Sequence, residues 1–170
     1  MYIADFPQAG YNVVTTASPK HTDYLLTLGA RSVIDYTQPA SSLLAGLHQH
    51  GPYLTIFSAM DNPASQAVMG EYLASQGGGS FLTAKGAFGV KFPEGVEGRF
   101  VQYLDDFLKP ELAEFTRWFY WEWLEEGVKG GGLKLGRVEM VEGGLEKAES
   151  ALRRLEGGVS GVKLVLDPFG

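Results

Sequence analysis

Apolar runs with strand character alternate along this chain with stretches that repeat apolar residues at the helical period. The strand-like runs span residues 12–17, 32–36, 53–58, 80–84, 100–104, part of 133–141, and 162–166. The helical stretches lie between them, at residues 20–28, 40–49, 63–75, 110–126 and 145–155. Strands that alternate with helices predict an α/β fold in which helices cover a doubly wound, mainly parallel sheet.

Local signals support several of these boundaries. The stretch at 20–28 ends at Gly29, and glycine is favoured just beyond the last turn of a helix. Asn62 and Pro63 combine a capping side chain with a proline in the first turn, which predicts a helix start. Residues 85–99 hold several glycines and no apolar period, so they predict a loop.

Composition describes an ordinary soluble domain. The chain has 170 residues with 45% hydrophobic and 20% charged residues, which predicts one globular domain over residues 1–170. It has no cysteine, so disulfides, thiolate metal sites and cysteine nucleophiles are excluded. A net charge of −6 argues against a nucleic-acid or anionic membrane surface. No apolar run approaches the roughly 20 residues of a membrane span, and no signal peptide precedes the domain, so we expect a cytoplasmic protein.

The strand at 12–17 ends in a pattern typical of a nucleotide-binding site. Thr16 and Ser18 supply hydroxyl groups there, and Lys20 supplies a positive charge. In a dinucleotide-binding fold the end of the second strand lies beside the adenosine ribose. An acidic residue at this place accepts from a free 2′-hydroxyl, whereas a hydroxyl and a cation suit the 2′-phosphate of NADP(H).

Ordered motifs also connect the chain to a known family. They are Ala9-Gly10-Tyr11-Asn12-Val13-Val14-Thr15-Thr16-Ala17-Ser18-Pro19-Lys20-His21, then Leu28-Gly29-Ala30, Val33-Ile34-Asp35-Tyr36, Val141-Glu142-Gly143-Gly144-Leu145-Glu146 and Gly158-Val159-Ser160-Gly161-Val162-Lys163-Leu164-Val165. In this order the segments resemble the nucleotide-binding domain of the medium-chain dehydrogenase/reductase superfamily. Within it they are similar to the fungal branch of zinc-free quinone and trans-acting enoyl reductases.

The chain departs from that family at its beginning. The resemblance implies a Rossmann-like fold, truncated at its amino-terminal end, without the catalytic domain, the first strand or the glycine-rich turn. The family's first strand is the centre of the sheet, so its loss leaves one unpaired inner edge on the strands at 12–17 and 32–36 and another on the strand at 53–58. Buried unpaired backbone groups cost roughly 1–3 kcal/mol each, so these edges need partners. We expect that they pair with each other or that a second chain closes them.

The resemblance places candidate cofactor-binding residues at the ends of four strands. It implies that Thr16, Ser18, Lys20 and Tyr36 contact the 2′-phosphate end of NADP(H). The alternative is that Ser18 only caps the following helix and that Lys20 is a solvated residue of its first turn.

Two other candidates, Ser58 and Thr83, close the strands at 53–58 and 80–84, and in the family these positions approach the nicotinamide ribose and the nicotinamide. Their alternative is an ordinary role in loops. No catalytic group stands out.

The long helix is unusually aromatic. Leu112, Phe115, Phe119 and Trp123 form one stripe, which predicts a side that faces the core. Trp118 and Trp121 lie off that stripe and indicate a partner surface or an apolar pocket, unless a loop covers them.

The histidines carry less information. His48 and His50 end a predicted helix without a third metal ligand at useful spacing, so we predict solvated side chains and no metal site. His21 belongs to the nucleotide motif, and we expect it at the surface.

Two classes of function remain open. The first is an NADP(H)-dependent reductase that transfers hydride to an activated double bond or a quinone, with a hydrophobic small molecule as substrate. The second is a reductase remnant used for non-redox work, as a small-molecule binder, a cyclase or isomerase, or a dimerising accessory protein. In both cases the family resemblance and the open sheet edges imply a homodimer.

Overall fold

The computed structural model describes residues 10–59, 62–85, 88–101, 106–134 and 136–170. Its strands are β1 (Val14–Ala17), β2 (Ser32–Asp35), β3 (Thr55–Ser58), β4 (Gly79–Thr83), β5 (Val96–Phe100), β6 (Val138–Val141) and β7 (Lys163–Leu166). Its α-helices are α2 (Thr22–Thr27), α3 (Ala40–His50), α4 (Pro63–Ser75), α5 (Ala113–Arg117), α6 (Leu124–Lys129) and α7 (Ala148–Glu156). Within this described part, no helix is long and apolar enough to cross a lipid bilayer.

The strands form parallel pairs, as the sequence predicts, but they are divided among separate sheets. β1 pairs with β2, β3 pairs with β4 and β4 with β5, and β6 pairs with β7. A Rossmann sheet has its first strand between the second and the fourth, which here are β1 and β3. Among the described residues no strand occupies that central place. β1 and β3 do not pair with each other there, so this one of the two alternatives is wrong, whereas closure by a second chain stays a prediction.

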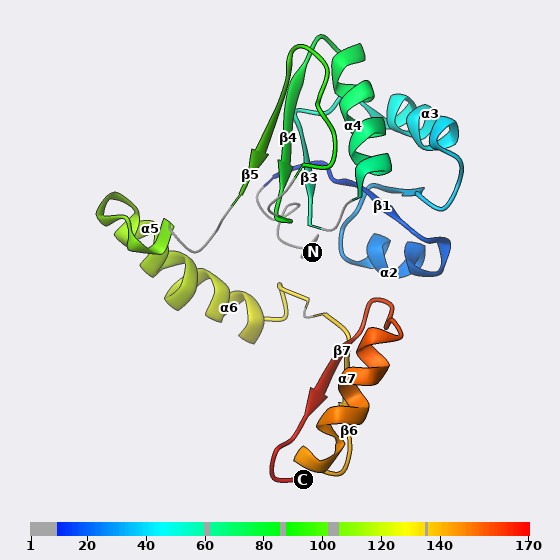
Figure 1. Cartoon of the computed structure of the whole chain (residues 1–170). Coiled ribbons are helices and arrows are strands. Elements are labelled where there is room, and N and C mark those ends of the chain that lie inside the picture. The colour runs from blue at the N-terminus through cyan, green and yellow to red at the C-terminus, as the bar shows by residue number, and fades with distance from the viewer. Residues whose placement is uncertain (1–9, 60–61, 86–87, 102–105, 135) are drawn as a thin grey trace.

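Helices cover both faces of the β1–β2 pair. On one face, Val13 and Val33 pack with α2 against the buried pair Leu28 and Ala30. On the other face, the buried side chain of Ile34 joins the main hydrophobic core. That core consists of Ile34, Leu43, Leu47, Val68, Tyr72, Leu73 and Phe81, and it lies between the strands and helices α3 and α4 (Figure 1). The β1–β2 pair therefore has helices on both faces, as in a doubly wound fold.

Helix α4 is anchored in the core by its cap and its buried side chains. It starts as predicted: the Asn62 side chain accepts from the Ser65 amide at 2.9 Å, and Ser65 Oγ accepts from the Asn62 amide at 3.1 Å. Leu73 is completely buried near its end. The glycine turn that follows needs glycine, because Gly78 has φ +113° and an added Cβ would overlap the Gly95 carbonyl oxygen.

The predicted position of the next strand is wrong. It predicts a loop over 85–99 and a strand over 100–104, whereas β5 runs from Val96 to Phe100 and pairs with β4. The rest of the predicted strand, 102–104, lies outside the described residues. β5 mixes Glu97, Gly98 and Arg99 with few apolar residues, so only its pairing with β4 makes it a strand.

The aromatic helix corrects a second expectation. It continues to Lys129 and contains a π-helical segment, Trp118–Trp123, between α5 and α6. Its predicted core stripe is not buried: Phe115 is 58% exposed, and Trp121 on the other side is 71% exposed. The helix extends away from the core (Figure 1), so its rings pack on one another, as Phe119 and Trp123 do at 5.1 Å between centroids. Nor does a loop cover Trp121.

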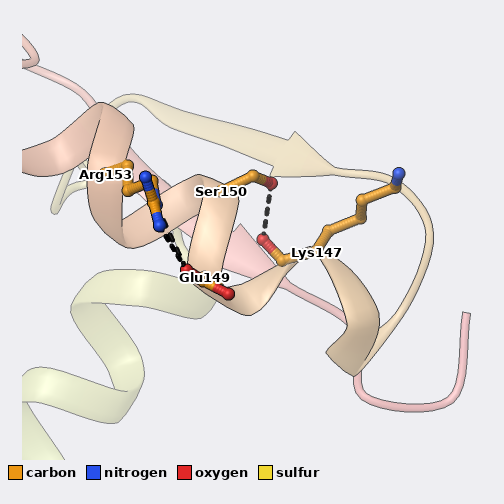
Figure 2. Close-up of polar contacts among 4 residues, drawn as sticks. All are labelled: Lys147, Glu149, Ser150 and Arg153. Carbon is orange, nitrogen blue, oxygen red and sulfur yellow. Dashed lines mark hydrogen bonds and ion pairs between the residues drawn. The ribbon is translucent and has the colours of Figure 1, made fainter.

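The last segment forms a small β6–α7–β7 unit of its own, set apart from the main core (Figure 1). On the solvent side of α7, Arg153 pairs with Glu149 at 2.6 Å, and Ser150 Oγ donates to the Lys147 carbonyl oxygen at 2.8 Å (Figure 2). A bridge from Arg154 to Glu139 at 2.5 Å ties α7 to β6. The charges of both arginines are therefore compensated locally.

Candidate functional site

The predicted cofactor residues lie at the carboxyl ends of parallel strands. The last register pair between β1 and β2 joins Ala17 to Asp35, so Ser18 and Tyr36 follow it on neighbouring strands. On the other sheet, Ser58 and Thr83 form the last pair between β3 and β4. Ligands of doubly wound folds bind beyond the carboxyl ends of the strands. The two groups of candidates therefore occupy the edge where such a ligand would lie.

Polar groups after β1 are available to a ligand. Ser18 precedes the short helical turn Pro19–His21, but its hydroxyl makes no capping hydrogen bond. Lys20 is exposed and forms no ion pair with a described carboxylate. A simple capping role for Ser18 is therefore not what the structure describes.

The turn after β2 is held by its own carboxylate. Asp35 accepts from the Thr37 amide at 2.8 Å, from the Thr37 hydroxyl at 2.6 Å and from Gln38 Nε2 at 3.0 Å. The Thr37 hydroxyl, followed by Gln38 and the Thr37 amide, holds the pKa of Asp35 below its usual value. This turn presents Tyr36 with its side chain about half exposed.

The candidates on the other sheet differ in access. Ser58 is half-buried, and its carbonyl oxygen accepts from the Ala84 amide at 2.9 Å. Thr83 is completely buried, and its hydroxyl oxygen accepts from the Lys85 amide at 3.1 Å. Thr83 therefore shapes the turn from within, while Ser58 retains some exposure toward the edge.

A cavity of about 440 Å³ lies beside β1, between helix α2 and the segments that flank β6 and β7. Its volume falls in the range of about 300–1,000 Å³ typical of small-molecule sites. It is lined by Thr15, Thr16, Ala17, His21, Tyr24, Leu25, Leu28, Lys134, Gly136, Arg137, Gly161, Val162 and Lys163. Of the predicted site residues, only Thr16 is among them.

His21 links the two walls of this cavity, and our expectation of a simple surface residue is incomplete. Its Nε2 lies 2.8 Å from Ser160 Oγ, and its Nδ1 lies 2.9 Å from Nη2 of Arg137. A guanidinium group can only donate, so Nδ1 accepts and the proton of the neutral ring is on Nε2, which donates to Ser160. Partial burial, then the charges of Arg137 and Lys20, lower the pKa of His21.

The cavity residues from the far end of the chain were beyond sequence reasoning. Ser160 is 139 residues from His21, and Arg137 is 116 residues from it. No local pattern marks Arg137 as different from the other arginines of this segment. Only the docking of the β6–α7–β7 unit beside α2 brings it to the end of β1.

Two histidines stand at the end of α3. His48 and His50 are exposed in its last turn, where we expected them. Over the described residues, no three side chains of His, Asp or Glu lie close enough together to hold a metal ion.

The chain has recognisable relatives among curated fungal proteins. It is 34% identical over 164 residues to the zinc-binding alcohol dehydrogenase domain-containing protein cipB of Emericella nidulans, covering 93% of this chain and 49% of that protein. It is 29% identical over 164 residues to the trans-enoyl reductase himH of Aspergillus japonicus, covering 94% of this chain and 46% of that protein. The chain thus spans about half the length of these relatives. No protein-family model matches it.

Solved structures agree on the fold. The CurF ER cyclopropanase of the curacin A biosynthetic pathway superposes with a TM-score of 0.65 at 18% identity, over 97% of this chain and 50% of that one. A putative NADPH:quinone reductase from Bacillus thuringiensis gives a TM-score of 0.65 at 20% identity, over 94% of this chain and 50% of that one. The α/β, Rossmann-like fold that the sequence predicts is therefore confirmed.

Proposed function

Because the chain belongs to the medium-chain dehydrogenase/reductase superfamily, alongside fungal trans-enoyl reductases, we propose that it is an NADP(H)-dependent reductase domain. The reaction would transfer a hydride to an activated double bond, as in an enone or enoyl thioester, or to a quinone. The nicotinamide supplies the hydride when it is bound. The substrate would be a hydrophobic small molecule.

The observation that carries this proposal is the polar group at the end of β1. The uncapped hydroxyl of Ser18 and the unpaired charge of Lys20 suit a 2′-phosphate, and no acid occupies the end of this strand to compete with it. Tyr36 follows the neighbouring strand and offers a hydroxyl and a ring beside them. These residues would bind and orient the adenosine end, while Ser58 lies at the end where the nicotinamide ribose would be placed.

A second candidate function is non-redox work in the same fold. It is favoured by the separate sheets of the described residues, in which β1 and β3 are not joined by a strand of the kind that leads to a phosphate-binding turn. The structural relative named a cyclopropanase indicates that this fold also carries other chemistry. In that case the chain would bind or shape a hydrophobic molecule without hydride transfer.

Cofactor binding separates the two candidates. Saturating NADPH at about 100 times its dissociation constant would add about 2.7 kcal/mol to the stability of the chain, and so raise its melting temperature by about 5–10 °C. The variant Lys20→Ala should weaken NADPH binding at least about tenfold and leave NADH binding unchanged, because it removes a charge-assisted contact to the 2′-phosphate. Lys91→Ala removes an exposed charge elsewhere and is the control. Absence of any NADPH effect would favour the non-redox candidate.

A further inference from the structure

The cavity beside β1 has a charge opposite to that of the whole chain. The protein has 20 acidic and 14 basic residues, yet Lys134, Arg137 and Lys163 line the cavity together with His21. No Asp or Glu is among its lining residues. A concave site with one sign of charge concentrates ligands of the other sign. The local charge therefore indicates an anionic ligand.

These cations lack the counterions that several other basic residues have. Lys129, Arg153 and Arg154 each form an ion pair with a glutamate. In the described part of the chain, Lys134, Arg137 and Lys163 form none. Lys134 donates instead to the neutral carbonyl oxygen of Thr27. The positive charge of the cavity is thus left uncompensated by the protein itself.

Arg137 is held in place for a ligand. Its Nε donates to the Gly161 carbonyl oxygen at 3.1 Å, its Nη2 donates to His21, and its guanidinium lies 4.5 Å above the Tyr24 ring centre. A guanidinium group has five N–H donors, so these two hydrogen bonds leave others for a ligand. Because these partners are neutral, they fix the position of the guanidinium group without compensating its positive charge.

We propose that this cavity binds an organic phosphate or diphosphate, with Arg137 as its principal contact and Lys134 and Lys163 beside it. Three uncompensated cations match the multiple charge of such a ligand better than the single charge of a carboxylate. Leu25, Leu28 and the Tyr24 ring provide an apolar surface for its organic part. The site is separate from the pair Ser18 and Lys20, which do not line the cavity, and it does not depend on hydride transfer.

Two sources have this chemistry. One is the diphosphate of the dinucleotide itself, since the cavity adjoins the end of β1, where we propose that the cofactor binds. The other is a separate phosphate ester, such as a phosphorylated substrate or carrier. Both would place the phosphate against Arg137, and binding competition distinguishes them.

The test is calorimetric titration of the purified chain with ADP and with pyrophosphate at low salt. Arg137→Gln should weaken both at least about tenfold, as expected for loss of a charge-assisted contact. Arg153→Gln removes the same charge from the same unit, at the exposed pair in Figure 2, and should change binding less than about twofold. Equal loss in both variants, or no binding by the unaltered chain, would overturn the proposal.

A second variant guards against unfolding. Arg137 also joins the two walls of the cavity, so its loss could release the β6–α7–β7 unit. Lys163→Gln removes a charge whose side chain makes no hydrogen bond or ion pair in the described structure. It should weaken ADP binding about threefold or more at an unchanged melting temperature. Unchanged ADP affinity in this variant would contradict the proposed charge cluster.

NADPH then identifies the source. If NADPH displaces pyrophosphate and Arg137→Gln weakens both, the ligand is the diphosphate of the dinucleotide. If both bind at once, the ligand is a separate phosphate ester; either result supports the site. Lys20→Ala should leave pyrophosphate binding unchanged. Pyrophosphate binding that needs Arg137, in a chain that does not bind NADPH, would therefore refute the reductase proposal and keep this one.

Discussion

The division of the molecule into a packed core and an exposed aromatic helix predicts very different costs for two large-to-small substitutions. Leu73 on α4 is completely buried in the main hydrophobic core, beside Gly79. Leu73→Ala loses its transfer free energy and leaves a cavity, at a cost of about 2–5 kcal/mol. For a chain of this length that lowers the melting temperature by about 4–20 °C. Trp121 is 71% exposed, so Trp121→Ala should change stability by no more than about 0.5 kcal/mol.

Both variants are compared by urea unfolding followed by far-ultraviolet circular dichroism, at a protein concentration where single chains prevail. A loss for Trp121→Ala as large as that for Leu73→Ala would refute the reasoning if it were independent of protein concentration. It would mean that the chain covers Trp121 with its own residues. A loss that grows with concentration would instead place Trp121 at a contact between chains.

Three further predictions follow from single features. We expect a homodimer whose interface exceeds about 1,000 Å² of buried surface, and light scattering that finds a monomer at tens of micromolar would remove it. The lowered pKa of His21 favours its neutral form in the folded state, so the stability from its hydrogen bond to Arg137 is complete above pH 6.5 and is lost as the pH falls through the lowered value. The protection of residues 158–166 from hydrogen exchange, relative to their intrinsic exchange rates, should therefore fall over that pH range. Gly78→Ala should destabilise the chain by about 1–3 kcal/mol in urea unfolding, because φ is positive and the Gly95 oxygen blocks a Cβ.

The sequence predicted most of the fold where local chemistry decides it. The cap at Asn62 starts α4 as expected, and the apolar run before Ser58 forms β3. The parallel pairing of neighbouring strands followed from alternation and family resemblance, whereas the division of the described strands into three separate sheets did not. Where pairing decides instead, the prediction failed: β5 has little strand character of its own, and its hydrogen bonds come from β4.

The site was only partly predictable for the same reason. Ser18 and Tyr36 are close because adjacent parallel strands end together, which a motif can indicate. Arg137 reaches His21 only through the docking of a distant unit, and nothing near it in the sequence records that contact. The aromatic stripe misled because a helical period shows that one side is apolar, without showing whether anything lies against it.

The placement of the tryptophans determines what the protein's intrinsic emission can report. The chain has three tryptophans, and Trp118, Trp121 and Trp123 all lie in the π-helical segment. None of them lines the cavity beside β1. Trp118 and Trp123, with ring centres 6.3 Å apart, are close enough for excited-state exchange. Tryptophan emission is therefore a built-in probe of the extended helix and of any chain that docks on it, while tyrosines such as Tyr24 and Tyr36 are the natural chromophores for ligand binding at the strand ends.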